Sequence, residues 1–356
     1  MHIGILTFHL AHNYGAVLQC YALQEVLRGM GHDVWVINYQ QPFMSEWFRP
    51  KRQFGVRSFL KALKKGSLAE YMGKSMHPYK VAHQFEAFRK KYLRLTEKCY
   101  GVDDIPPMDL YLVGSDQPWN PDLTGGTDMV YYGQFPRPST SQLATYAMSG
   151  SIEAISKVGW ENVKQYTMSF DALSFREANL AKSISELTDR PCETVLDPTL
   201  LADASLWKPM INKRWSKHNY VLLYHVGGPK HVIEAITEKA KTIAKSEKLE
   251  FIDASHYQYS PSDFVSIIRH ARYVITASFH AMVFSIIFHL PFVVVKTGQA
   301  SDARFTNLLD SLGITGDVLR APEDIRIPAR IDDIAISKKL EKEKQVSINF
   351  LHKISS

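Results

Sequence analysis

The strongest constraint on the fold is a repeated order of apolar strand, polar loop and helix. Residues 2–8 predict a buried strand, residues 16–30 a helix, and residues 33–39 a second strand. A strand, a helix and a strand within about forty residues form a βαβ unit, which favours a parallel sheet. Further strands are predicted at residues 110–114, 143–148, 172–175, 193–196, 220–225, 249–253, 273–276 and 292–296. We therefore predict an α/β protein.

The chain length of 356 residues favours two domains. We expect a Rossmann-like domain over residues 1–205 and a second one over residues 215–325, facing each other across a cleft. A basic, helical excursion from the first domain is predicted at about residues 41–98. The last segment, residues 331–356, is predicted to be a helical tail.

Positive charge is concentrated in one stretch of the chain. The formal net charge is +6, and residues 51–98 alone hold thirteen Lys and Arg against three Glu and no Asp. One interpretation is a solvated helical face. The other is peripheral contact with an anionic membrane, where each basic residue contributes about 1 kcal/mol. Nucleic acid is not expected as a partner, because no recognised binding motif accompanies the charge.

The cysteines and the N-terminus indicate a reducing compartment. Cys20, Cys99 and Cys192 stand too far apart to fit a disulfide framework or a zinc site. The N-terminus lacks the basic region and cleavage site of a secretory signal. The longest apolar run, residues 281–295, is shorter than the ~20 residues that span a bilayer. We expect a cytoplasmic protein with no bound metal.

Two loops that follow strands of the first domain are candidate binding sites. Ligands of open parallel sheets bind outside the carboxyl ends of the strands, where helices begin. The first loop holds Asn13, Tyr14 and Gly15 at a helix N-terminus, which attracts anions. The second loop holds Ser115, Asp116, Gln117 and Trp119. Here an acid can orient or deprotonate a sugar hydroxyl and an aromatic ring can stack on a sugar, although the acid is equally suited to capping a turn.

Three further candidates carry positive charge or exchange protons. Arg176 follows a predicted strand, where it is suited to bidentate binding of an anion or to a local ion pair with Glu177. His280 lies with Ser278 at a strand-to-helix junction, where it can donate to an anion or transfer protons. Arg304 begins a later helix and is expected to complete an anion pocket.

These loops, in this order, resemble the polysaccharide pyruvyl transferase family. The segments that carry the resemblance are HNYGAVLQCYALQEVLRGMGHDVWVINY, LYLVGSDQPWNP, LSFREA, VLDPTLL and VITASFHAMVFSIIFHLPFVVV. The resemblance implies two Rossmann-like domains arranged as in GT-B glycosyltransferases. It also implies phosphoenolpyruvate as the donor, and as acceptor a sugar of a bacterial surface polysaccharide (an exopolysaccharide or capsule) or of its lipid-linked precursor. Relatives often carry Arg-Leu/Phe-His where this chain has Ser-Phe-His at residues 278–280.

The resemblance also gives roles to the candidate residues. Phosphoenolpyruvate is a small anion, for which Arg176, Arg304 and helix N-termini are suitable partners. His280 is the candidate acid or phosphate contact, and Asp116 the candidate base or hydroxyl-orienting group. No separate cofactor is expected. The alternatives are a GT-B glycosyltransferase that uses a nucleotide sugar and a non-catalytic sugar-binding protein.

Overall fold

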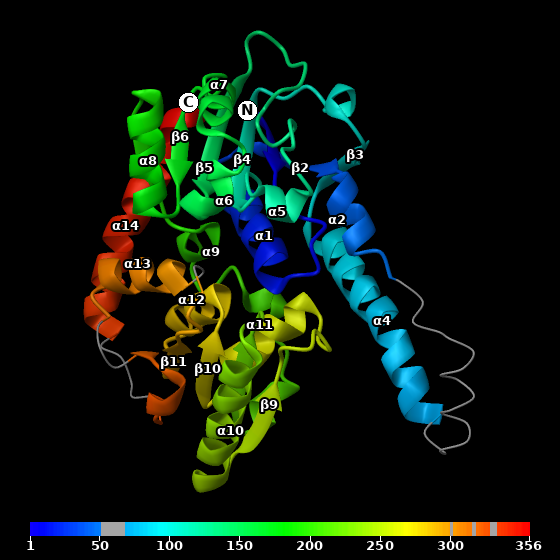
Figure 1. Cartoon of the computed structure of the whole chain (residues 1–356), viewed down its shortest axis with the longest axis vertical. Helices are drawn as coiled ribbons and strands as arrows, with labels where there is room; N and C mark the ends of the chain where they lie inside the picture. Colours follow the sequence, from blue (N-terminus) through cyan, green and yellow to red (C-terminus); the bar gives the residue numbers. More distant parts are fainter. Residues whose placement is uncertain (51–67, 300–301, 315–317, 328–332) are drawn as a thin grey trace.

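The computed structural model describes residues 1–50, 68–299, 302–314, 318–327 and 333–356. Its core is built from two parallel sheets, one of seven strands and one of five, each covered by helices (Figure 1). The predicted α/β class with two Rossmann-like sheets is confirmed. Long apolar strands such as residues 110–116 are buried along almost their whole length, as expected for a sheet covered on both faces.

The first sheet has the strand order β3-β2-β1-β4-β5-β6-β7. Its strands are β1 His2–Leu6, β2 Asp33–Tyr39, β3 Leu95–Cys99, β4 Leu110–Asp116, β5 Gln142–Met148, β6 Leu173–Phe175 and β7 Cys192–Thr194. Its helices are α1 Tyr14–Gly29, α2 Pro42–Trp47, α4 Leu68–Tyr92, α5 Pro121–Thr124, α6 Ile152–Ser156, α7 Trp160–Thr167, α8 Ala178–Thr188 and α9 Pro198–Leu201. The strand order reverses between β1 and β4, so the loops after these two strands flank a crevice.

The second sheet has the order β12-β11-β10-β8-β9. Its strands are β8 Tyr220–His225, β9 Glu250–Asp253, β10 Tyr273–Ala277, β11 Phe292–Val295 and β12 Leu319–Arg320. Its helices are α10 Lys230–Ser246, α11 Pro261–His270, α12 Phe279–Ile287 and α13 Asp302–Leu312. Single 3₁₀ turns lie at Val102–Asp104, Lys208–Met210, Trp215–Lys217 and Pro322–Asp324. Here the order reverses between β8 and β10.

The last helix, α14 (Asp333–Ile354), returns from the second domain to the first. Its Ser347 hydroxyl accepts a hydrogen bond from the backbone N–H of Leu196 at 2.9 Å. Lys353 forms an ion pair with Glu193 at 3.2 Å, and Phe350 is buried. The predicted helical tail is therefore packed against the end of the first sheet.

A continuous apolar core joins the two domains. Tyr14, at the start of α1, is fully buried and stacks on Phe264 of α11 with ring centroids 4.2 Å apart. Its hydroxyl donates to the backbone oxygen of Tyr259 at 2.9 Å. Because Tyr14 belongs to the first domain and its partners to the second, this contact fixes how the domains face each other.

The predicted helical excursion at residues 41–98 ends earlier than expected. Residues 95–99 form β3, which pairs with β2 at the edge of the first sheet. Glu97 and Lys98 are exposed on this strand, so it lacks the apolar run of the buried strands. Residues 51–67 of the excursion lie outside the described residues.

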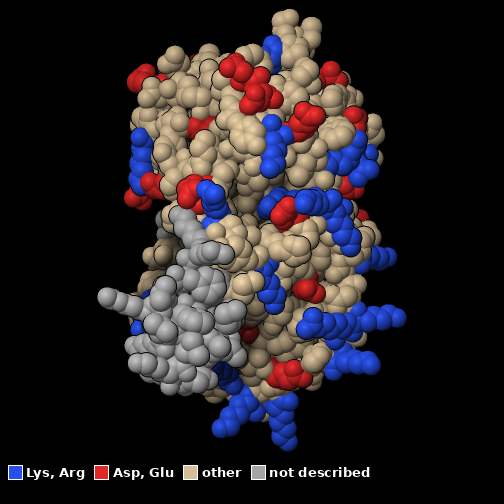
Figure 2. Space-filling view, turned by 90° about the vertical axis from the view of Figure 1, so that its right-hand side faces the viewer, with Lys and Arg blue, Asp and Glu red and all other residues tan. Residues whose placement is uncertain are grey.

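Helix α4 covers the first domain with its apolar side. Val81, Phe85 and Phe88 are buried, whereas Lys80 and Lys90 are exposed. On the side of the molecule that carries α4, Lys and Arg side chains project mainly from the lower half (Figure 2). Among the described helices, none combines the length and apolar character needed to cross a bilayer.

Candidate functional site

A cavity of about 570 Å³ lies where the two reversals of strand order face each other. It is closed on one side by the residues after β1 and β4, and on the other by those after β8 and β10. The polar residues of its wall come from both domains: Asn13, Asp116, Gln117, Asp122, Ser278, His280, Thr297, Gln299 and Arg304. This cavity therefore lies where the rule predicts a ligand, at the carboxyl ends of the parallel strands.

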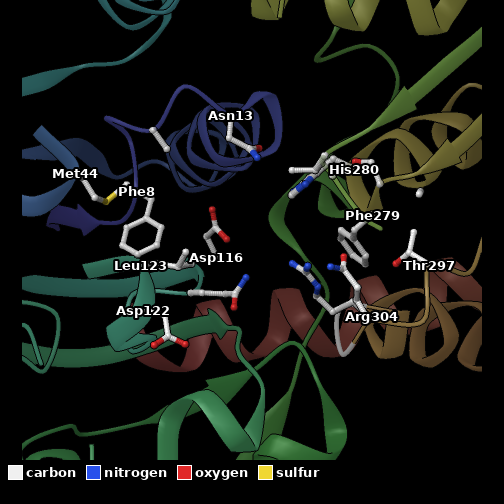
Figure 3. Close-up of a pocket in the computed structure, with 18 of the residues that line it drawn as sticks. Phe8, Asn13, Met44, Asp116, Asp122, Leu123, Phe279, His280, Thr297 and Arg304 are labelled. Carbon is white, nitrogen blue, oxygen red and sulfur yellow. The ribbon is translucent and has the colours of Figure 1, made fainter. Parts of the chain in front are cut away.

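The first domain contributes two acids, Asp116 and Asp122, and two amides. Asp116 ends β4 and points into the cavity between the two domains (Figure 3). Its backbone oxygen accepts from the N–H of Ser149 at 2.8 Å, which holds it beside β5. Asn13 caps α1 by accepting from the N–H of Ala16 at 3.2 Å. The Gln117 side-chain oxygen accepts from the amide of Asn120 at 3.1 Å.

The second domain contributes the positive side of the cavity. Ser278 is the N-cap residue of α12 without a side-chain capping bond, and His280 follows in the first turn. Arg304, in the first turn of α13, faces the cavity from the same side (Figure 3). Burial lowers the pKa of Arg304, and the nearby charge of Arg176 lowers it further, whereas Glu177 and Asp116 oppose the change. A bound anion would stabilise this guanidinium.

Arg176 lies behind the cavity wall and is held by the first domain. Its side chain is only 5% exposed, and it donates to Asp197 at 2.8 Å, Ser149 at 2.6 Å and Glu177 at 3.2 Å. Its guanidinium also stacks 4.4 Å above the ring of Phe279. The ion pair considered for Arg176 is thus present, and its binding of an anion stays a prediction.

Asp197 is the centre of this buried network. Its side chain is fully buried, accepts from the hydroxyl of Thr199 at 2.6 Å and lies 3.4 Å from the hydroxyl of Ser115. The Nε2 atom of His280 lies 3.6 Å from the same carboxylate. Burial alone would raise the pKa of Asp197, but His280 and Arg176 outweigh burial and hold this pKa well below its usual value. Arg176 and His280 thus meet at one carboxylate, while only His280 lines the large cavity.

Gly15 provides the space that His280 occupies. A Cβ atom at this position would overlap the imidazole ring of His280. The first turn of α1, from the first domain, is therefore packed directly against a side chain of the second domain. Any larger residue at position 15 would displace His280 from Asp197.

Two predicted site residues are placed in the core instead. Trp119 is 1% exposed, donates its indole N–H to the backbone oxygen of Tyr131 at 2.8 Å and stacks on Tyr132. A sugar ring therefore has no access to its faces, which corrects the predicted stacking role. Tyr14 packs between the domains rather than on the cavity wall.

Sequence reasoning missed Asp197 and the aromatic residues of α2. Asp197 stands in VLDPTLL, directly after a predicted strand, which is the same signal that drew attention to Asp116. Phe43 and Trp47 of α2 line the cavity, yet they fall in the stretch interpreted as a helical excursion. Conversely, His225 and Lys296, which also follow strands, do not line it.

Comparisons with solved structures find similar folds at low sequence identity. The spinosyn forosaminyltransferase SpnP is 10% identical over 100% of both chains, with a TM-score of 0.42. The UDP-GlcNAc 2-epimerase from Methanocaldococcus jannaschii is 10% identical over 96% of this chain and 92% of its own, with a TM-score of 0.48. The E. coli heptosyltransferase WaaC, solved with ADP, is 10% identical over 96% and 100%, with a TM-score of 0.40.

Sequence comparison with curated proteins finds no match. A family model does match, over residues 13–298. This span begins at the end of the loop after β1 and includes the cavity residues from Asn13 to His280 and Thr297. Four-fifths of the chain is thus covered, and the chain belongs to the polysaccharide pyruvyl transferase family, a family of transferases.

Proposed function

We propose that this transferase moves a pyruvyl group from phosphoenolpyruvate to two hydroxyls of one sugar, forming a pyruvate ketal. The observation that carries the proposal is the polarity of the interdomain cavity. Arg304 and His280 line it from the second domain, and Asp116 lines it from the first. A cationic group, a proton-transfer group and a carboxylate around one cavity are what a small anionic donor and a hydroxylated acceptor require.

The donor is assigned to the second-domain side. A phosphate or carboxylate of phosphoenolpyruvate would be bound by the guanidinium of Arg304 and by the N-terminus of α12, whose first N–H groups attract anions. Arg176 supports this side indirectly, because it fixes Asp197, and Asp197 in turn orients His280. The proposed donor pocket therefore does not need the arginine that relatives often carry at position 278.

The reaction has three balanced steps. His280 delivers a proton to the methylene carbon of the donor, which leaves an oxocarbenium-like carbon. The first sugar hydroxyl adds to this carbon. Phosphate then leaves and the second hydroxyl adds in its place. One hydroxyl proton restores His280, and the other passes through Asp116 to the departing phosphate, so both residues return to their starting states. The products are the ketal and inorganic phosphate.

The acceptor is proposed to be a sugar of a bacterial surface polysaccharide or of its lipid-linked precursor, modified in the cytoplasm. The local excess of positive charge in residues 51–98 supports contact with the inner face of an anionic membrane. Such attachment would be reversible and weakened by salt, since charges are screened over about 8 Å at physiological ionic strength. Sedimentation with anionic and neutral vesicles tests it: equal binding to both, or none to either at low salt, rules it out.

The function is tested by incubating the protein with phosphoenolpyruvate and a panel of sugars. We expect phosphate release that depends on the sugar, and a ketal methyl signal in the proton NMR spectrum of the product. A parallel panel of nucleotide sugars tests the glycosyltransferase alternative. Transfer from a nucleotide sugar without any reaction of phosphoenolpyruvate would replace the proposed function, and inactivity with both donors would favour a non-catalytic sugar-binding role.

A further inference from the structure

The cavity has a second, apolar end on the first domain. Met44 of α2 and Leu123 of α5 lie on the side away from Arg304 and Thr297 (Figure 3). Phe43 and Trp47, on the same short helix as Met44, also line the cavity. The side chains at the two ends differ in kind. One end presents a guanidinium, an imidazole and a helix N-terminus, whereas the other presents aromatic and aliphatic carbon with the carboxylates of Asp116 and Asp122 nearby.

Two large aromatic side chains at the apolar end are exposed to solvent. Trp47 is 67% exposed and Phe43 38%, although both are large aromatic residues on a helix of only six residues. Their rings stack on each other with centroids 5.6 Å apart and an angle of 29° between the planes. We refer to this pair as the α2 aromatic shelf.

The shelf is held in place rather than loosely attached. Gln41 caps α2 by accepting from the N–H of Met44 at 2.6 Å, and its amide donates to the backbone oxygen of Thr124 at 2.8 Å. A Cβ atom at Gly125 would lie 2.6 Å from the ring of Phe43, so this ring packs directly on the backbone that ends α5. Phe43 is thereby fixed, and Trp47 is stacked on it.

We propose that the α2 aromatic shelf binds the acceptor, by stacking of a pyranose ring on Trp47, which Phe43 supports from behind, so that its hydroxyls reach Asp116. A pyranose presents a flat face of C–H groups, which packs on aromatic rings, and an edge of hydroxyls, which need carboxylate or amide partners. The shelf supplies an aromatic surface for the C–H face, and Asp116, Gln117 and Asp122 supply hydrogen-bond partners for the hydroxyls. The inference rests on the proposed function for the identity of the reaction, but not for the binding of the sugar.

An anionic occupant does not fit this end of the cavity. Asp116 and Asp122 would repel the phosphate and carboxylate of phosphoenolpyruvate, whereas they can accept hydrogen bonds from neutral hydroxyls. Lys157 forms an ion pair with Asp122 at 2.5 Å and is about half exposed, so part of that charge is neutralised at the surface. The division of the cavity into an anion end and a neutral-sugar end follows from these charges.

The test measures sugar binding without the donor. Saturation-transfer NMR is recorded with methyl glycosides of galactose, glucose, mannose and N-acetylglucosamine on the wild-type chain, Trp47→Ala and Trp47→Phe. Tyr100→Ala is the matched control, because Tyr100 is 65% exposed on the same domain and does not line the cavity. We expect saturation transfer from the wild-type protein to at least one glycoside, a loss of affinity of about 3- to 10-fold in Trp47→Ala, partial recovery in Trp47→Phe, and no change in the control.

The kinetic counterpart separates the two proposals. For the sugar that reacts, Trp47→Ala should raise its KM by a similar factor and leave the KM for phosphoenolpyruvate unchanged. Absence of saturation transfer from the wild-type protein to every glycoside, or equal affinity in Trp47→Ala, overturns the shelf whatever the donor assay gives. Sugar binding that depends on Trp47 in a protein that does not react with phosphoenolpyruvate would retain the shelf and reject the proposed function.

Discussion

Replacing Asp197 by Asn removes the central charge of the buried network while keeping its shape. The variant keeps one oxygen to accept from Thr199, but its new NH₂ group faces Arg176 and His280, which are donors themselves. Breaking a buried ion pair from one side costs about 3–5 kcal/mol. Because Arg176 still has Glu177 at 3.2 Å, we expect the lower end, about 3 kcal/mol.

The free energy of unfolding at pH 7, measured with urea, checks this estimate. The pKa of Asp197 is depressed in the folded protein, so its contribution to stability is complete at pH 7 and is lost as the pH falls below about 4. The difference in the free energy of unfolding between the wild type and Asp197→Asn should therefore become smaller only below that pH. Turnover should fall by at least about tenfold, since proton transfer by His280 contributes ~10²–10⁴ and depends on its orientation.

Glu193→Gln is the matched control. Glu193 lies on the neighbouring strand β7 and pairs with Lys353, but that pair is exposed, and exposed pairs contribute about 0–1 kcal/mol. If Asp197→Asn is no more destabilised than Glu193→Gln and keeps full turnover, then the network neither stabilises the fold nor orients His280, and this reasoning is refuted.

Three other changes test separate parts of the site. Gly15→Ala should lower turnover because its Cβ displaces His280. Gly29→Ala, at the open end of the same helix, is the control and should leave turnover unchanged. Equal turnover in the two variants would show that His280 can move freely. Asp116→Asn should keep the fold and donor binding and lower turnover by ~10²–10⁴, and unchanged turnover would reduce Asp116 to a structural residue. Burial lowers the pKa of His9 to about 4, so the unfolded chain binds a proton that the folded one excludes. His9 alone should therefore account for about 3 kcal/mol of the drop in unfolding free energy between pH 6.5 and 4. Urea titrations of His9→Gln should show a smaller drop, and an identical one would contradict this assignment.

The fold was predictable because its signals are local. Buried parallel strands are continuous apolar runs, and each ends at a loop that begins a helix. Edge strands carry no such run. For this reason the sequence predicted β3, with Glu97 and Lys98 exposed, as part of the basic helical excursion. Topology also located the cavity, since the loops after β1, β4, β8 and β10 all contribute to it.

The roles of single side chains in these loops were less predictable, because they depend on residues distant in sequence. Trp119 is buried by Tyr131 and Tyr132, and Arg176 forms an ion pair with Asp197, 21 residues away along the chain. Tyr14 faces the second domain, some 245 residues from its hydrogen-bond partner. A motif shows that such residues are near a site, while packing decides whether they contact the ligand.

Direct titration of phosphoenolpyruvate into the protein by calorimetry tests the central claim, that the second-domain side of the cavity binds this donor. The account predicts saturable binding to the wild type, at least tenfold weaker binding to Arg304→Gln, and unchanged binding to Arg272→Gln, an exposed arginine of the same domain that does not line the cavity. No binding to the wild type, or equal binding to both variants, would contradict it.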